Sequence, residues 1–405
     1  MKIVVFGLTI SSSWGNGHAT LWRGLCRALD RKGHRLVFYE RDTPYYAGAR
    51  DCWEIPGGEL VLYRDWDEVR GRAGRDVADC DLALVSSYCP DGIAATELVL
   101  SGRAMTAFYD LDTPVTLGRL ERGEPLSYVG PAGLSGFDLV FTYTGGRALD
   151  ALRDRLGARR VVALYGHVDP DVHRPAEIAP HYAADLSYLG TFAIDRQAAL
   201  ETLFVEPARR RPGQRFFIGG AQYPDDFPWS HNTFFVRHLP PGEHAAFFSS
   251  SRLTLNVTRH DMAAMGWCPS GRLFEAAACG AAIVTDVWEG LEAFFSPREE
   301  ILCARGADDV VAALDLDGAQ IRRVARAARE RTLAQHTSDR RAEELLRAIG
   351  EGRAPSSPRR EREREAARTD GRQEASGRVA HQEKQRARRR LFQNLEQRIR
   401  AFRVF

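Results

Sequence analysis

Short apolar runs alternate with amphipathic stretches along the first 350 residues of the chain. In the first half, runs rich in β-branched and aromatic residues predict strands at residues 2–8, 35–40, 81–86, 104–110, 138–143 and 160–166. Between these runs, apolar positions recur with helical spacing, as in residues 18–33 and 144–157. This alternation is typical of a parallel α/β sheet.

A second series of the same kind follows a proline-rich join at residues 167–185. Its predicted strands lie at residues 185–190, 215–220, 232–239, 252–257, 281–286 and 300–304. We therefore predict two Rossmann-like parallel-sheet domains, an N-terminal domain at residues 1–175 and a C-terminal domain at residues 185–348. Two such domains facing each other form a cleft at the carboxyl ends of both sheets, where open α/β folds bind ligands.

Residues 351–405 differ from the rest of the chain in composition. They carry 16 Arg or Lys against 8 Asp or Glu, so the net charge of +2 for the whole chain leaves the preceding residues net negative. Before Leu391 they hold almost no apolar side chains, so burial cannot offset the entropy lost on ordering. We predict a disordered, charged extension, and its interspersed glutamates give no clear indication of a nucleic-acid partner.

The cysteines and the apolar runs bear on the compartment. The seven cysteines include no CxxC pair, which favours reduced thiols and a cytoplasmic protein. No apolar run is long enough to span a membrane, and we expect a soluble protein without a transmembrane segment. Three of the 56 basic residues are lysines, so any anion site must rely on arginine and backbone amides.

The segment MGWCPSGRLFEAAACGAAIVTD, residues 265–286, is the richest in candidate chemistry. A helix is predicted to begin at Ser270 or Gly271 and to end at Gly280, with Glu275 in its second turn. The amides and the dipole at a helix start favour a diphosphate, and a carboxylate one turn later can accept both hydroxyls of a ribose. The segment therefore predicts a nucleotide-sugar pocket.

The connection after the first predicted strand also holds candidate ligand groups. In TISSSWGNGHATLW, Gly15 and Gly17 precede a helix predicted to begin near His18. The spacing is not the dinucleotide motif GxGxxG, since Thr20 stands three positions after Gly17. Two interpretations stay open: a simple turn, or a ligand loop in which His18 donates to a phosphate or to an acceptor.

Two carboxylates follow the predicted strand at residues 104–110. Asp110 and Asp112 stand at the expected cleft edge of the N-terminal domain. Either one could bind acceptor hydroxyls or act as a general base. The alternative is a structural role, in which they cap the turn before Pro114.

The C-terminal domain offers further charged groups after its predicted strands. Arg259 directly follows the strand at residues 252–257, and we interpret it either as a diphosphate ligand or as a surface arginine. Glu289 follows the strand at residues 281–286, and the neighbouring Gly290 amide could contact a donor.

Two segments carry a resemblance to a known family. GHVDPDVHRP, residues 166–175, resembles the interdomain segment of glycosyltransferase family 4, and CPSGRLFEAAACGAAIVTD, residues 268–286, resembles its donor-site motif. Residues 1–348 as a whole are similar to the CgeB-like, or spore-maturation-protein-like, glycosyltransferases of that broad group. The resemblance implies the GT-B fold, a nucleotide-sugar donor held mainly by the C-terminal domain, no metal and no other cofactor.

The same resemblance implies roles for individual residues. Glu275 would hold the donor ribose, Gly17 would belong to the N-terminal glycine loop, and Arg196 would be a cationic ligand of the diphosphate. Two positions depart from the family pattern. Trp267 stands where the family has a carboxylate, eight residues before Glu275, and His173 stands where its linker has an aromatic residue.

We therefore predict an enzyme, similar to hexosyltransferases, that moves a sugar from a nucleotide-diphosphate sugar to an acceptor hydroxyl without a metal. The catalytic candidates are Asp112, Asp110 and His18. The acceptor could be a glycan, a lipid, a protein or a small molecule, and loops within residues 44–75 are expected to bind it. Two alternatives stay open: a catalytically inactive sugar- or nucleotide-binding scaffold, and a sugar-nucleotide epimerase.

Overall fold

The computed structural model describes residues 1–15 and 17–352. Residues up to 166, the N-terminal half, form a seven-stranded sheet in the order β3-β2-β1-β4-β5-β6-β7. Its strands are β1 (Lys2–Gly7), β2 (Arg35–Arg41), β3 (Gly58–Tyr63), β4 (Leu82–Ser86), β5 (Met105–Asp110), β6 (Leu139–Thr142) and β7 (Val161–Ala163). All neighbouring strands are parallel, and Val4 of β1 aligns with Val37 on one side and Ala83 on the other.

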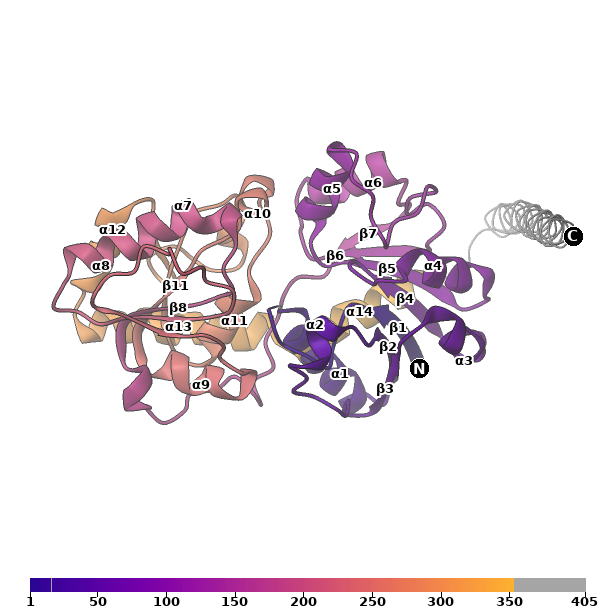
Figure 1. The fold of residues 1–405 in the computed structure, drawn as a ribbon, viewed down its shortest axis with the longest axis horizontal. Coiled ribbons are helices and arrows are strands. Elements are labelled where there is room, and N and C mark those ends of the chain that lie inside the picture. Colours follow the sequence, from indigo (N-terminus) through magenta and orange to yellow (C-terminus); the bar gives the residue numbers. More distant parts are fainter. Residues whose placement is uncertain (16, 353–405) are drawn as a thin grey trace, which may run out of the picture. The chain divides into compact units, whose positions relative to one another are not determined.

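Helices cover both faces of this sheet (Figure 1). They are α1 (His18–Arg31), α2 (Pro44–Ala47), α3 (Trp66–Ala78), α4 (Gly92–Ser101), α5 (Thr113–Glu121) and α6 (Ala148–Leu156). Because side chains alternate along a strand, Ile3 and Val5 of β1 pack into one core with Leu25 of α1, while Val4 and Phe6 pack into the other. All six predicted strands are present, and β3 adds a half-buried edge strand that we had not predicted.

The C-terminal half repeats the design with a six-stranded sheet in the order β10-β9-β8-β11-β12-β13. Its strands are β8 (Ala184–Leu189), β9 (Phe216–Gly219), β10 (Thr233–Val236), β11 (Ser251–Asn256), β12 (Ala282–Thr285) and β13 (Leu302–Cys303). Its helices are α7 (Gln197–Leu200), α8 (Glu206–Arg210), α9 (Pro241–Ser249), α10 (His260–Met265), α11 (Gly271–Ala278), α12 (Ala307–Leu314) and α13 (Gly318–Gln335). Short 3₁₀ and π turns lie at Pro180–Tyr182, Ile194–Arg196, Glu201–Val205 and Leu291–Ala293. The prediction of two parallel α/β domains is confirmed.

The last described helix, α14 (Ser338–Gly352), returns to the N-terminal half. Figure 1 shows it among the elements of the first sheet. Its apolar residues, including Leu345 and Ile349, join the core that contains Leu25 and Leu29 of α1. The predicted domain at residues 185–348 therefore ends in a segment that packs with the other domain.

The chain crosses between the two halves a second time just before α14, and buried polar contacts fix this crossing. The Val168 amide donates to the His336 carbonyl at 3.0 Å, and the Ser338 amide donates to the Val168 carbonyl at 2.8 Å. Arg341, which is 2 % exposed, donates from Nε to the carbonyls of Tyr165 and Gly166.

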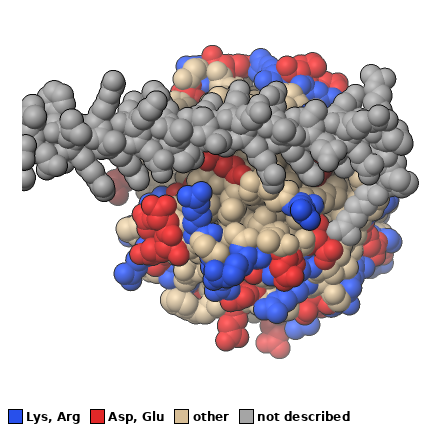
Figure 2. Space-filling model, turned by 90° about the vertical axis from the view of Figure 1, so that its right-hand side faces the viewer, with Lys and Arg blue, Asp and Glu red and all other residues tan. Residues whose placement is uncertain are grey.

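Further observations concern the surface, the thiols, membrane-spanning helices and the tail. On the face shown in Figure 2, acidic and basic side chains of the described residues are intermixed. All seven cysteines are free thiols. Within residues 1–15 and 17–352, no helix is long and apolar enough to cross a bilayer. The disorder predicted for residues 351–405 falls almost entirely outside the described residues.

Candidate functional site

A cavity of about 590 Å³ lies between the two halves of the described chain. Residues that directly follow strands line it: Leu8, Leu111 and Tyr143 from the first sheet, and Gly190, Gly220 and Val257 from the second. The cavity is thus bounded by the carboxyl ends of both sets of parallel strands, the position expected for ligand binding in open α/β sheets.

Most of the predicted site residues line this cavity. They are Gly15, Gly17, His18, Asp112, Arg196, Arg259, Ser270, Gly271 and Glu275. Asp110, Glu289 and Gly290 lie outside the lining, for physical reasons given below. The functional roles of all these residues stay predictions.

The loop after β1 is held by a buried carboxylate. Glu40, at the end of β2, is 0 % exposed. Its carboxylate accepts from the amides of Ile10 and Ser11 at 2.8 and 3.0 Å and from the Thr9 hydroxyl at 2.9 Å. Gly15 then adopts a φ of +67°, in the left-handed region that glycine enters without cost. These contacts place the loop and the start of α1 at the cavity.

His18 and Asp112 approach each other from different elements of the N-terminal half. His18 begins α1, and Asp112 precedes α5. The His18 Nε2 lies 3.6 Å from the Asp112 Oδ2. Tyr88, which we had not predicted, lines the cavity beside them, with its ring centroid 5.7 Å from that of His18. Its φ of +63° is uncommon for a bulky residue, and such strained positions cluster at functional sites.

Asp110 is a buried carboxyl group beneath Asp112. It ends β5, is 0 % exposed, and accepts from the Thr116 hydroxyl at 3.0 Å and the Asp112 amide at 3.2 Å. Burial, the largest effect, raises the pKa of Asp110 to about 6. It contacts the backbone that carries Asp112 and lies outside the cavity lining, so the geometry favours a positioning role over contact with an acceptor.

The start of α11 presents backbone amides to the cavity. Ser270 has an extended conformation, and among the described residues no side chain caps the helix. A helix start of this kind favours an anion through its free amides and its dipole. Arg272, in the first turn, also lines the cavity, and its Nη1 donates to Asn256 Oδ1 at 3.0 Å. Desolvation lowers the pKa of Arg272. We had not predicted it, although its place in the first helical turn was a usable signal.

Arg196 and Arg259 extend this positive wall of the cavity. Arg196 donates to the Thr191 carbonyl, and its buried Nε has no partner within the described residues. Arg259 pairs with Asp195 at 2.7 Å, which orients the guanidinium. Three arginines of the C-terminal half therefore line the same cavity as the amides of α11.

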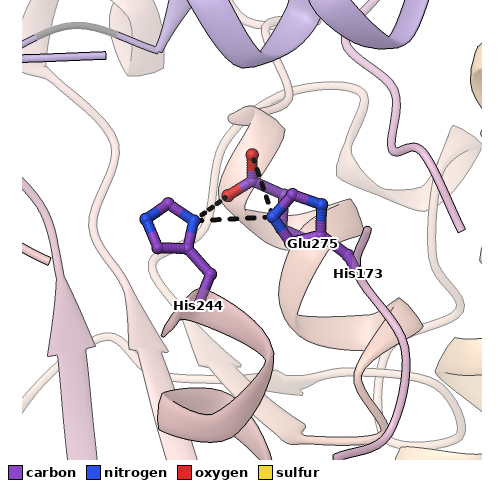
Figure 3. A group of neighbouring side chains, drawn as sticks. All are labelled: His173, His244 and Glu275. Carbon is purple, nitrogen blue, oxygen red and sulfur yellow. Dashed lines mark hydrogen bonds and ion pairs between the residues drawn. The ribbon is translucent and has the colours of Figure 1, made fainter. Parts of the chain in front are cut away.

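Glu275 points toward two histidines, as Figure 3 shows. Its Oε1 lies 3.9 Å from His173 Nε2, and its Oε2 lies 3.8 Å from His244 Nδ1. Thr20 of α1 lies 3.5 Å from Oε1. Burial lowers the pKa of His244 to about 4, so the imidazole is neutral at pH 7. The carboxylate thus meets groups from both halves of the chain, and sequence reasoning missed the partner in α9.

Trp267 explains why Glu289 and Gly290 lie away from the cavity. Its amide donates to the Glu289 carbonyl at 2.6 Å, and its carbonyl accepts from the Gly145 amide at 2.9 Å. Cβ atoms built at Gly146 and Gly290 would each lie 2.4 Å from its indole ring. Gly290 therefore lies against the indole and Glu289 pairs with the Trp267 backbone, where the sequence had placed both beside the donor.

Comparison with known proteins bears on the C-terminal half of the chain and on the fold. Residues 196–347 match the family model described as glycosyl transferase-like. No curated protein matches the sequence. The matched residues contain the arginines, the start of α11 and Glu275.

Solved structures match almost the whole described chain. Sucrose-phosphate synthase from Thermosynechococcus elongatus aligns with a TM-score of 0.64 at 15% identity, covering 86% of this chain and 98% of that chain. HepE from Anabaena, solved with UDP and glucose, gives 0.61 at 9% identity, with 86% and 99% covered. An alpha-glucosyltransferase solved with UDP gives 0.59 at 12% identity, with 86% and 100% covered. The predicted GT-B fold is confirmed. The CgeB-like subgroup stays a prediction.

Proposed function

We propose that this protein is a glycosyltransferase that moves a sugar from a nucleotide-diphosphate sugar to an acceptor hydroxyl. The observation that carries the proposal is the convergence of the uncapped start of α11, three arginines and Glu275 on one cavity between two Rossmann-like domains. The glycosyl transferase-like match over residues 196–347 supports it. HepE and the alpha-glucosyltransferase were solved with UDP, so UDP is the first nucleotide to test.

The donor side follows from charge. The diphosphate binds the amides of Gly271 and the residues after it, where the helix dipole is positive. Arg196 and Arg272 neutralise the charge that develops as the nucleoside diphosphate departs. These groups replace a metal at the diphosphate. One turn into the helix, Glu275 accepts hydrogen bonds from the ribose hydroxyls.

The acceptor side lies at the N-terminal half. The acceptor oxygen attacks the anomeric carbon, the bond from that carbon to the diphosphate oxygen breaks, and the acceptor proton passes to Asp112. The His18 Nε2 lies 3.6 Å from that carboxylate and helps to orient it. A hexose donor and a CgeB-like subgroup are the finer form of this proposal, carried by the motifs at residues 166–175 and 268–286.

Calorimetry with UDP tests the donor site. Charge-assisted hydrogen bonds contribute about 1.5–3 kcal/mol each, so Glu275→Ala should weaken UDP binding on the order of a hundredfold, and Glu275→Gln should weaken it less. Glu299→Gln, at an exposed glutamate, is the matched control and should bind like the wild type. Equal UDP affinity in all four proteins would remove Glu275 from the site.

Turnover separates the enzyme from the scaffold alternative, which Trp267 favours because it replaces a carboxylate of the family pattern. With a panel of UDP-sugars, the wild type should release UDP and Asp112→Asn should release it at least about a hundredfold more slowly. Both proteins should bind UDP equally. Tight UDP binding by the wild type with no turnover of any sugar or acceptor would support the scaffold.

A further inference from the structure

Three side chains with metal-binding atoms meet at the wall of the cavity. His173 comes from the segment between the two sheets, His244 from α9 and Glu275 from α11. One ligand atom from each lies within 4.8 Å of the others. Figure 3 shows the carboxylate and both rings directed toward a common point.

The separations suit an ion between the three groups. The two histidines approach at 3.5 Å through His173 Nε2 and His244 Nδ1. The carboxylate lies 3.9 Å from the first nitrogen and 3.8 Å from the second. Two ligands placed at about 2.1 Å from a tetrahedral ion are about 3.4 Å apart. Small side-chain movements therefore close the group around one ion.

Hydrogen bonding within this group leaves one of its close contacts unpaired. The His244 Nε2 lies 3.2 Å from the Leu239 carbonyl. A carbonyl oxygen can only accept a hydrogen bond, so Nε2 must be the donor. That contact places the proton on Nε2 and leaves a lone pair on Nδ1, toward the carboxylate and His173. His173 Nε2 carries at most one hydrogen, which can point at only one of its two neighbours. A cation at the centre attracts all three groups at once.

The donor set suits zinc. Two imidazoles and one carboxylate form a known zinc ligand set, which leaves a fourth position open. Imidazole ligands disfavour Mg²⁺ and Ca²⁺. The backbone carbonyl behind His244 is the usual partner of a metal-bound histidine. His244 and Glu275 line the cavity, while His173 lies behind them at 4 % exposure, so the open position faces the cavity.

We propose that His173, His244 and Glu275 bind Zn²⁺, and that bound zinc competes with the donor nucleotide. The second part rests on the proposed function, because the ribose and the zinc would use the same carboxylate. Zinc would thereby act as an inhibitor of donor binding, away from the diphosphate contacts of Arg196 and Arg272.

Zinc binding is measured first, without nucleotide. The full chain is stripped with EDTA and titrated with Zn²⁺ against a chromogenic chelator, and Co²⁺ is added in parallel to read the coordination from its visible absorption. We expect one equivalent and a tetrahedral Co²⁺ spectrum. Losing a partner behind a ligand costs about 10–100-fold in affinity, so His173→Gln and His244→Ala should each cost more than about 100-fold. His231→Ala, at an exposed histidine, is the control.

Folding of the variants is checked by thermal unfolding in EDTA, where each should melt like the wild type. If one histidine variant melts at a lower temperature than the wild type, the other variant and the Co²⁺ spectrum of the wild type decide whether these side chains bind the metal. No stoichiometric zinc binding, or zinc affinity unchanged in both histidine variants, overturns the site.

Competition is measured by titrating UDP with and without one equivalent of Zn²⁺. We expect zinc to weaken UDP binding to the wild type at least tenfold and to leave UDP binding to His244→Ala unchanged. That variant also corrects for zinc bound by UDP itself. Zinc binding without an effect on UDP overturns the competition. If UDP does not bind in EDTA, the proposed function is contradicted. The metal site is then tested by the zinc titration alone, which does not depend on UDP.

Discussion

Replacing Asp110 with asparagine should remove a loss of stability that the wild type suffers as the pH rises. Asp110 is fully buried at the end of β5. One of its oxygens accepts two hydrogen bonds, and the other, Oδ2, has no partner within the described residues. Burial makes the charged form costly. Asparagine keeps a carbonyl oxygen for the Thr116 hydroxyl and the Asp112 amide, and it cannot ionise.

The sign and size follow from the pKa. Burial raises the pKa of Asp110 from 3.8 to about 6 in the folded protein. The folded protein holds the Asp110 proton more tightly than the unfolded chain does. The free energy of unfolding is therefore highest below pH 4, and this stabilisation is lost as the pH rises through 6. At about 1.4 kcal/mol for each unit of pKa, the loss is about 3 kcal/mol. The asparagine variant should equal the wild type near pH 4 and exceed it by up to about 3 kcal/mol above pH 7.

Urea unfolding at pH 4, 5, 6, 7 and 8 measures this difference. Asp226→Asn, at an exposed aspartate, is the control and should leave the pH dependence of the wild type unchanged. If Asp110→Asn unfolds with the same pH dependence as the wild type, Asp110 does not ionise in this range and the reasoning is refuted. Asp110→Asn should also keep transferase activity, because Asp110 lies behind Asp112 and outside the cavity lining. A loss of activity as large as that of Asp112→Asn would place Asp110 in the catalytic step.

Three further substitutions test the packing that shapes the site, each by urea unfolding at pH 7. Gly290→Ala should lower the free energy of unfolding by about 2–3 kcal/mol, because φ is +89° and the new Cβ would lie 2.4 Å from the Trp267 ring. The control, Gly213→Ala, adds its Cβ in open space and should lower it by less than 1 kcal/mol. Arg341→Met should cost about 3 kcal/mol, since buried carbonyls lose a charged donor; a loss under about 1 kcal/mol would mean that water replaces it. Glu40→Gln should cost about 2 kcal/mol and weaken UDP binding, because an amide group would face hydrogen-bond donors; unchanged binding would separate the loop from the site.

The sequence predicted the sheets well because their signal is local. Buried parallel strands are short apolar runs, and each run outside the edge was found. The strand β3 (Gly58–Tyr63) escaped because it is half-buried at the sheet edge, and its GELVLY pattern is weaker. The docking of α14 could not be predicted, since an amphipathic helix shows which face it buries and not which core receives it.

The candidate site was predictable where one element supplies the chemistry. The start of α11 and Glu275 follow from the order of residues along a single helix, as Arg272 in its first turn would have done. The approach of His173 and His244 to Glu275 depends on how three separate elements pack, and no spacing in the sequence encodes it. The same holds for Glu40, whose buried carboxylate is recognisable only once the loop after β1 is placed against it.

Trp267 shows how a departure from a family pattern can be compensated by structure. Its φ of +51° is rare for a bulky residue, and strain of this kind persists only where the surroundings hold it. Here its backbone pairs with Gly145 of the N-terminal half and Glu289 of the C-terminal half, and its ring fills the space between Gly146 and Gly290. The position therefore joins the two halves by packing where the family places a charge. Restoring a carboxylate would leave a void between two glycines, so the contacts to a donor sugar must come from other residues of the cavity.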